Sequence, residues 1–285
     1  LVVGGAVFWA EAFGWDTLVV DYLLFALLSG VVLGGTLSSA QARAEAKGEI
    51  LTDDEEGWPG PQDLIFFTLV GLIILTPLLY IFAPLGTDAQ FLGFHTLTTR
   101  FGESFTTLTP YEPQATVIVS PGFHAFSAYI SQQLDQPIPM IHMSVTAIVL
   151  FLAMWLAYDI GAELQNKRLG RAMAIAFLLC GGVFVSYLDG HFTELMALLF
   201  MMAFVLYALR FIRQASVADM VAGGLMIGAV LYTNLSLSIV LMLGFIPLVA
   251  LVWMTPQPER ASVAVMQSRL GLTFGFPLVA LLGTA

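Results

Sequence analysis

Long runs of apolar residues, separated by short polar segments, dominate this chain. A helix needs about 20 mostly apolar residues to cross the hydrocarbon core of a bilayer. Runs of this kind occupy residues 17–37, 64–83, 139–160, 171–188, 192–211, 217–233, 235–254 and 270–285. If residues 1–13 end an earlier run, the pattern predicts an all-α, polytopic transmembrane helix bundle of about eight or nine spans. Because the sequence begins at Leu1 and stops within an apolar run, we expect it to be part of a longer protein.

One polar interval, residues 84–140, is far longer than the others, and long loops of this kind tend to be functional. Within 88–105, large apolar residues recur every three or four positions, which predicts an amphipathic helix lying on the membrane surface. Residues 120–134 predict a second surface helix, with Ser120 as N-cap and Pro121 at the first helical position. The Thr- and Pro-rich stretch 106–119 between them is typical of a loop.

The basic residues predict the orientation of the bundle. When the spans alternate in direction, nine of the ten Lys and Arg residues fall in four loops on one side, and only Arg100 falls on the other. The positive-inside rule makes that side cytoplasmic. We therefore expect an integral protein of the plasma (inner) membrane, with loop 84–140 on the non-cytoplasmic side. Residues 1–63 would form N-terminal spans and an acidic cytoplasmic loop, and 64–285 the main transmembrane module.

Composition supports membrane lipids as the surroundings and excludes nucleic acid. Hydrophobic residues make up 58% of the chain and charged residues 11%, whereas soluble domains carry about 25% charged residues. The net charge is −10, and no basic stripe is present to neutralise phosphates. The only cysteine, Cys180, lies inside an apolar run. This position predicts that its side chain is buried and packs as a small apolar residue.

Candidate chemistry collects on the predicted outer side. Asp88 follows the span 64–83 closely, where it can act as a general base or cap the next helix. Arg100 can bind a phosphate or lipid headgroup, or simply be solvated. His124 can orient a phosphate, transfer a proton or serve a structural role.

Further polar residues lie on the same side. All four histidines (His95, His124, His142 and His191) fall there, together with the acidic residues Glu103, Asp189 and Glu194. Asp189-Gly190-His191 reads as a short polar turn between spans. The sequence contains no metal-ligand cysteine pattern and no glycine-rich phosphate loop.

The order of these features resembles the GT-C-type membrane glycosyltransferases, including the protein O-mannosyltransferase and aminoarabinose-transferase-like branches. Matching pieces are Asp88 after the span 64–83, VSPGFHAFSAYISQQL at 119–134, NKRLGRA at 166–172 and SYLDGHFTELMALLFMMAFVLYALR at 186–210. The resemblance covers roughly residues 64–254 and implies a bundle with two interfacial helices in its first outer loop.

The resemblance also implies a reaction. Members of the group transfer a sugar from a polyprenyl-phosphate carrier to an acceptor at the outer face. Asp88 would be the catalytic base, and Arg100 would meet the departing phosphate. His124, His191, Glu103 and Asp189 are expected to support substrate binding. No cofactor is implied beyond the lipid-linked donor substrate.

Two other functions stay open. Many relatives carry an Asp-Glu pair where this chain has Asp88-Ala89, which motivates a non-catalytic subunit of a larger membrane complex as the alternative. A transporter is the third hypothesis, but the sequence contains no convincing internal repeat of the kind that transporters often show.

Overall fold

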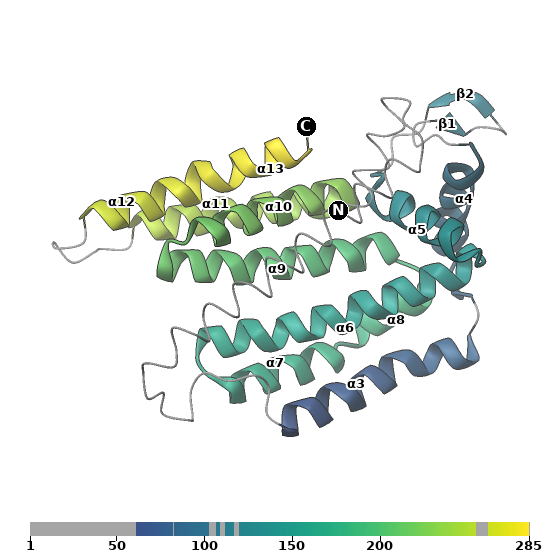
Figure 1. The fold of residues 1–285 in the computed structure, drawn as a ribbon, viewed down its shortest axis with the longest axis horizontal. Coiled ribbons are helices and arrows are strands. Elements are labelled where there is room, and N and C mark those ends of the chain that lie inside the picture. Colours follow the sequence, from purple (N-terminus) through teal and green to yellow (C-terminus); the bar gives the residue numbers. More distant parts are fainter. Residues whose placement is uncertain are drawn as a thin grey trace.

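The computed structural model describes residues 61–81, 83–102, 107–108, 112–116, 120–254 and 262–284. This part of the chain is almost entirely helical, as predicted, and its longest helices run side by side (Figure 1). The predicted span 17–37, most of the acidic segment 38–63 and the candidate residue Glu103 lie outside the described residues.

The elements follow one another with short connections. In chain order they are α3 (Pro61–Tyr80), α4 (Thr87–Gly102), β1 (Thr107–Leu108), β2 (Glu112–Thr116), α5 (Gly122–Leu134), α6 (Ile138–Leu164), α7 (Lys167–Leu178), α8 (Gly181–Asp189), α9 (Phe192–Gln214), α10 (Val217–Thr233), α11 (Leu235–Met254), α12 (Ser262–Leu270), the π-helical turn η2 (Gly271–Gly275) and α13 (Phe276–Thr284).

Among these helices, three are long and apolar enough to cross a membrane, namely α6, α9 and α11, and α7 with α8 would make a fourth as one bent span. Many large apolar side chains point outward from them, as on α11, where Leu243 and Ile246 are each 65% exposed. Such an exterior suits hydrocarbon rather than water. A membrane helix bundle is thus supported, whereas a total of eight or nine spans stays a prediction.

The predicted continuous span 171–188 is broken in the structure. Helices α7 and α8 meet at an angle of 46°, and Leu179 and Cys180 occupy the break. Cys180 is exposed rather than buried, so its predicted environment was wrong. A glycine pair, Gly181 and Gly182, follows the break, and glycine has low helix propensity.

The predicted boundary between the apolar runs 217–233 and 235–254 is confirmed. Helix α10 ends at Thr233 and α11 begins at Leu235. The side chain of the intervening Asn234 accepts a hydrogen bond from the Leu237 backbone N–H (2.9 Å), which caps the start of α11.

Ion pairs join helices at the end of the bundle where α6 and α9 finish. Arg213 and Arg210 both contact Glu163, with N···O distances of 3.1 and 3.5 Å. Arg171 pairs with Asp63 at 2.6 Å, which ties the start of α7 to the start of α3. These contacts place Arg171, Arg210 and Arg213 at one end of the helices.

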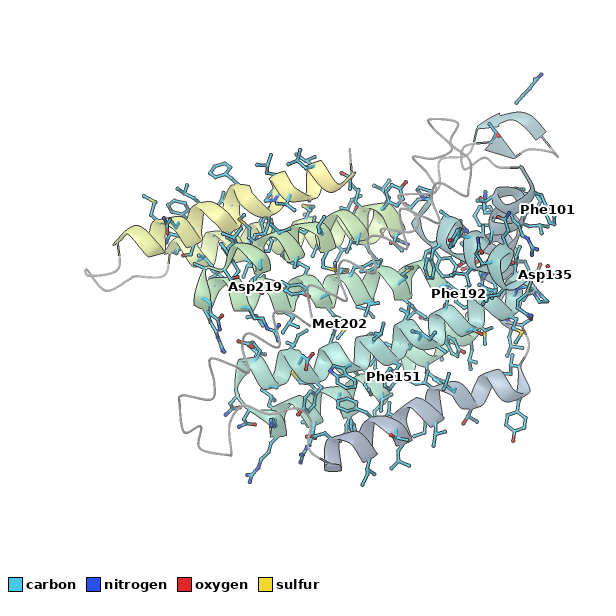
Figure 2. The ribbon with its side chains drawn as sticks, in the orientation of Figure 1. Phe101, Asp135, Phe151, Phe192, Met202 and Asp219 are labelled. Atoms are coloured by element: carbon cyan, nitrogen blue, oxygen red, sulfur yellow. The ribbon has the colours of Figure 1, made fainter. Side chains whose placement is uncertain are left out.

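Helices α4 and α5 lie at the opposite end, where α4 runs across the direction of the long helices (Figure 1). Figure 2 shows Phe101 and Asp135 at this end and Asp219 at the other. The two helices predicted in loop 84–140 are therefore present, although Pro121, not Ser120, is the N-cap of α5. The stretch between them contains a two-stranded antiparallel sheet, β1–β2, which the prediction of a plain loop missed.

Close contact between α10 and α13 gives a test of the packing. A Cβ at Gly224 would lie 2.6 Å from Cβ of Val279, whereas one at Gly244 on α11 would meet no described atom within 4 Å. We expect Gly224→Ala to lower the free energy of unfolding by about 1–3 kcal/mol through overpacking. Thermal unfolding of the purified protein measures this, with Gly244→Ala as the matched control. Equal melting temperatures for the two variants would contradict the α10–α13 contact.

Candidate functional site

A buried polar cluster joins helices α4 and α5 to the bundle. Its centre is the hydroxyl of Thr96 on α4, which lies 3.0 Å from Nδ1 of His124 on α5 and 2.9 Å from Nε2 of His142 on α6. Thr96, His124 and His142 are all almost completely buried. One side chain therefore connects three successive helices.

The hydrogen-bond geometry around Thr96 fits one pair of tautomers for the two imidazoles. Its hydroxyl donates to the Leu92 carbonyl of the preceding turn, at 3.0 Å. Because a hydroxyl has one proton and two lone pairs, its oxygen then accepts from both histidines. His124 is therefore protonated at Nδ1 and His142 at Nε2. In neutral His124 this leaves Nε2 as a bare acceptor.

Burial keeps His124 uncharged. Loss of solvation is the largest cause that lowers its pKa from 6.5 to about 3; the neighbouring His142 and His95 add to the effect, and a hydrogen bond to the Leu92 carbonyl opposes it. Burial also lowers the pKa of His95 on α4. A neutral imidazole with a bare nitrogen cannot donate to a phosphate, so this geometry gives no support to the expected phosphate role of His124.

Asp88 and His191 form a second, exposed pair. Oδ2 of Asp88, in the first turn of α4, lies 3.5 Å from Nδ1 of His191, the N-cap residue of α9. Their side chains are 63% and 37% exposed. Asp88 is thus accessible to a ligand while it faces an imidazole that can exchange a proton with it.

The turn between α8 and α9 is packed tightly against the start of α4. Gly190 adopts φ 91°, which favours glycine, and a Cβ there would overlap the Cβ of Ala89. Leu85 also donates its backbone N–H to the Leu188 carbonyl at 2.9 Å. These contacts bring His191 to Asp88 and pack Ala89 against Gly190.

Arg100 is already engaged at the other end of α4. It donates to Ser131 Oγ at 2.8 Å and to Asp135 Oδ1 at 3.4 Å, which joins the C-terminal ends of α4 and α5. Asp88 lies twelve residues earlier on the same helix, about 18 Å away at the usual helical rise. The two residues expected to share one site are therefore apart.

The structure thus divides the predicted site residues among three places. Asp88 and His191 are together; Asp189 ends α8 next to their turn; Arg100 lies with α5, and His124 is buried with Thr96. Within the described part of the chain, no three His, Cys, Asp or Glu side chains are arranged to hold a metal ion.

An apolar groove of about 440 Å³ lies between α3 and α6. Phe67, Gly71, Phe151 and Trp155 are among the residues that line it. The rings of Phe67 and Trp155 stack, with centroids 4.2 Å apart. The groove provides a surface for hydrocarbon, separate from the polar end of the bundle.

No known protein family, curated protein or solved structure compared with this chain matches it.

Sequence reasoning missed Thr96 and the role of His142. The sequence offered one indication of this cluster, because all four histidines fall on the predicted non-cytoplasmic side. The meeting of His124 and His142 at one hydroxyl depends on how α4 and α5 cross the end of α6, which helical periodicity does not specify.

The lowered pKa of His124 predicts a loss of stability in acid. Below pH 6.5 the unfolded chain binds a proton that the folded chain excludes until about pH 3, so the stability present above pH 6.5 falls as the pH drops through this window. The slope contributed by His124 is about 1.4 kcal/mol per pH unit. Thermal unfolding at pH 7.5 and 5.5 measures it, and His124→Asn should flatten the dependence. A melting temperature that rises toward pH 5.5 would contradict the buried neutral imidazole.

Proposed function

We propose that this chain is a GT-C-type membrane glycosyltransferase-like protein that transfers a sugar from a polyprenyl-phosphate carrier to an acceptor at the non-cytoplasmic face. The observation that carries the proposal is the Asp88–His191 pair. It combines an exposed carboxylate and an imidazole 3.5 Å apart. The carboxylate also occupies the position after a predicted span where the resembling enzymes carry their catalytic base.

The proposed chemistry needs one base and one leaving group. Asp88 takes the proton of the acceptor hydroxyl while the oxygen attacks the anomeric carbon of the sugar. The bond from that carbon to the phosphate oxygen breaks, and the carrier leaves as polyprenyl phosphate with the bonding electron pair. His191 accepts the proton from Asp88 or orients its carboxylate, since the two side chains face each other.

The surroundings of the pair are compatible with a lipid-linked donor. The pair lies at the end of the bundle with α4 and α5, opposite the basic end, so the positive-inside rule supports a non-cytoplasmic location. The groove between α3 and α6 offers hydrocarbon contacts of the kind that a polyprenyl chain requires. Arg100 contributes by holding α4 against α5 rather than by contacting phosphate.

A second candidate is a non-catalytic subunit of a membrane complex, and the break between α7 and α8 favours it. Leu179 is 79% exposed there, and a Cβ at Gly181 or Gly182 would meet no described atom within 4 Å. Backbone that is not helical is tolerated at membrane depth only where protein or water covers it. A neighbouring subunit is one way to cover this break.

Asp88→Asn tests the enzyme proposal. It keeps the size of the side chain but removes the base, so transfer should fall by about 10²- to 10⁴-fold. The assay supplies polyprenyl-phosphate sugars to membranes that contain the protein and measures released polyprenyl phosphate. The control is Asp135→Asn, which alters an exposed carboxylate paired with Arg100.

The outcomes separate the two candidates. Loss of release in Asp88→Asn but not in Asp135→Asn, with unchanged melting temperatures, supports the enzyme. Equal release by wild type and Asp88→Asn contradicts the role of Asp88. A wild-type protein that releases nothing but co-purifies with other membrane subunits supports the non-catalytic candidate.

A further inference from the structure

Three polar atoms beneath the α4–α5 pair are buried and unpartnered by any described residue: Nε2 of His95, Nε2 of His124 and Oγ of Ser127. Their side chains belong to residues that are 8%, 2% and 0% exposed. Buried polar atoms in folded proteins nearly always have a hydrogen-bond partner, and each exception requires an explanation. Leaving such an atom unpaired is destabilising.

The three atoms belong to one small region. The ring centroids of His95 and His124 are 5.6 Å apart, yet the two imidazoles share no direct hydrogen bond. Ser127 follows His124 by three residues on α5, so both project from the same face of that helix. His95 lies seven residues after Asp88 on α4, about 10 Å away along the axis. The region is therefore separate from the Asp88–His191 pair.

We propose that His95, His124 and Ser127 form a buried binding site for one small, neutral hydrogen-bond donor, either a water molecule or the hydroxyl of a bound molecule. The bare Nε2 of His124 accepts the hydrogen bond from this group. Ser127 and His95 offer further hydrogen-bonding atoms in the same region, so one O–H group can satisfy more than one buried atom at once.

Charged ligands do not fit the same atoms. An anion would bring a second acceptor to the bare nitrogen of His124, because Nδ1 carries its proton toward Thr96. A metal ion would need more ligands: Nε2 of His142 is engaged by Thr96, and no suitable group of three ligands occurs in the described ranges. Of these three classes of ligand, a neutral O–H donor fits the atoms of the site.

The site can be tested by NMR on the purified protein labelled with ¹⁵N-histidine in detergent at pH 7.5. Two-bond proton–nitrogen spectra report the tautomer of each ring, and Overhauser contacts report which molecules lie beside the ring protons that flank Nε2. We expect His124 to carry its proton on Nδ1. We also expect a contact from water to the His95 and His124 rings, or one from octyl glucoside hydroxyls when that amphiphile is added.

Water and the hydroxyl of a bound molecule give different Overhauser contacts. A contact with water in the protein alone identifies water as the occupant, and one that appears only with octyl glucoside identifies a bound hydroxyl. Absence of both contacts overturns the proposal, as does a proton on Nε2 of His124. A shift of both Nε2 signals on addition of one equivalent of ZnCl₂ overturns it in favour of a metal site.

Variants distinguish an Overhauser contact that comes from a bound group from one that comes from nearby solvent. His95→Phe should abolish the contact at His124, whereas His191→Phe, which alters a histidine outside the site, should leave it unchanged. Ser127→Ala, a smaller change that preserves packing, should also abolish the contact and serves if His95→Phe does not fold. Persistence of the contact in folded Ser127→Ala and His95→Phe would contradict the site.

Discussion

The position of helices α4 and α5 depends on the hydroxyl of Thr96. This single group holds α4 to α5 through His124 and to α6 through His142. Because His124 and His142 are buried, removing the hydroxyl would leave two imidazole nitrogens without this partner in a region of low dielectric constant. The contact thereby fixes the middle of α4, while Arg100 fixes its C-terminal end against α5.

The placement of α4 in turn determines the surroundings of Asp88. The start of the helix is packed on the turn at Gly190, where only small residues fit, and this turn brings His191 to the carboxylate. The same crowding accounts for Ala89, which is 7% exposed. Asp88 and the buried His95 lie on the same helix but in separate polar sites.

Much of the architecture could be predicted from the sequence because it follows from local pattern. Apolar runs predicted the long helices and the boundary between α10 and α11, and the spacing of large apolar residues predicted α4. The break at Cys180 was missed because hydrophobicity alone does not distinguish a straight apolar helix from a bent one. The β1–β2 pair was missed because its strands are very short. The separation of Asp88 from Arg100 follows directly from helix length, once the whole of 87–102 is known to be helical.

The assignment of α4 and α5 to the non-cytoplasmic end of the bundle is tested most directly by cysteine labelling in intact cells. Cys180 is the only cysteine in the chain, so a Cys180→Ala background allows one new cysteine at a time. Asp135, with a side chain 97% exposed, marks the α4–α5 end, and Gln165, exposed after α6, marks the other. A membrane-impermeant maleimide should label Asp135→Cys in intact cells and Gln165→Cys only after the membrane is opened. Labelling of Gln165→Cys in intact cells, with Asp135→Cys protected, would contradict the orientation on which the proposed chemistry depends.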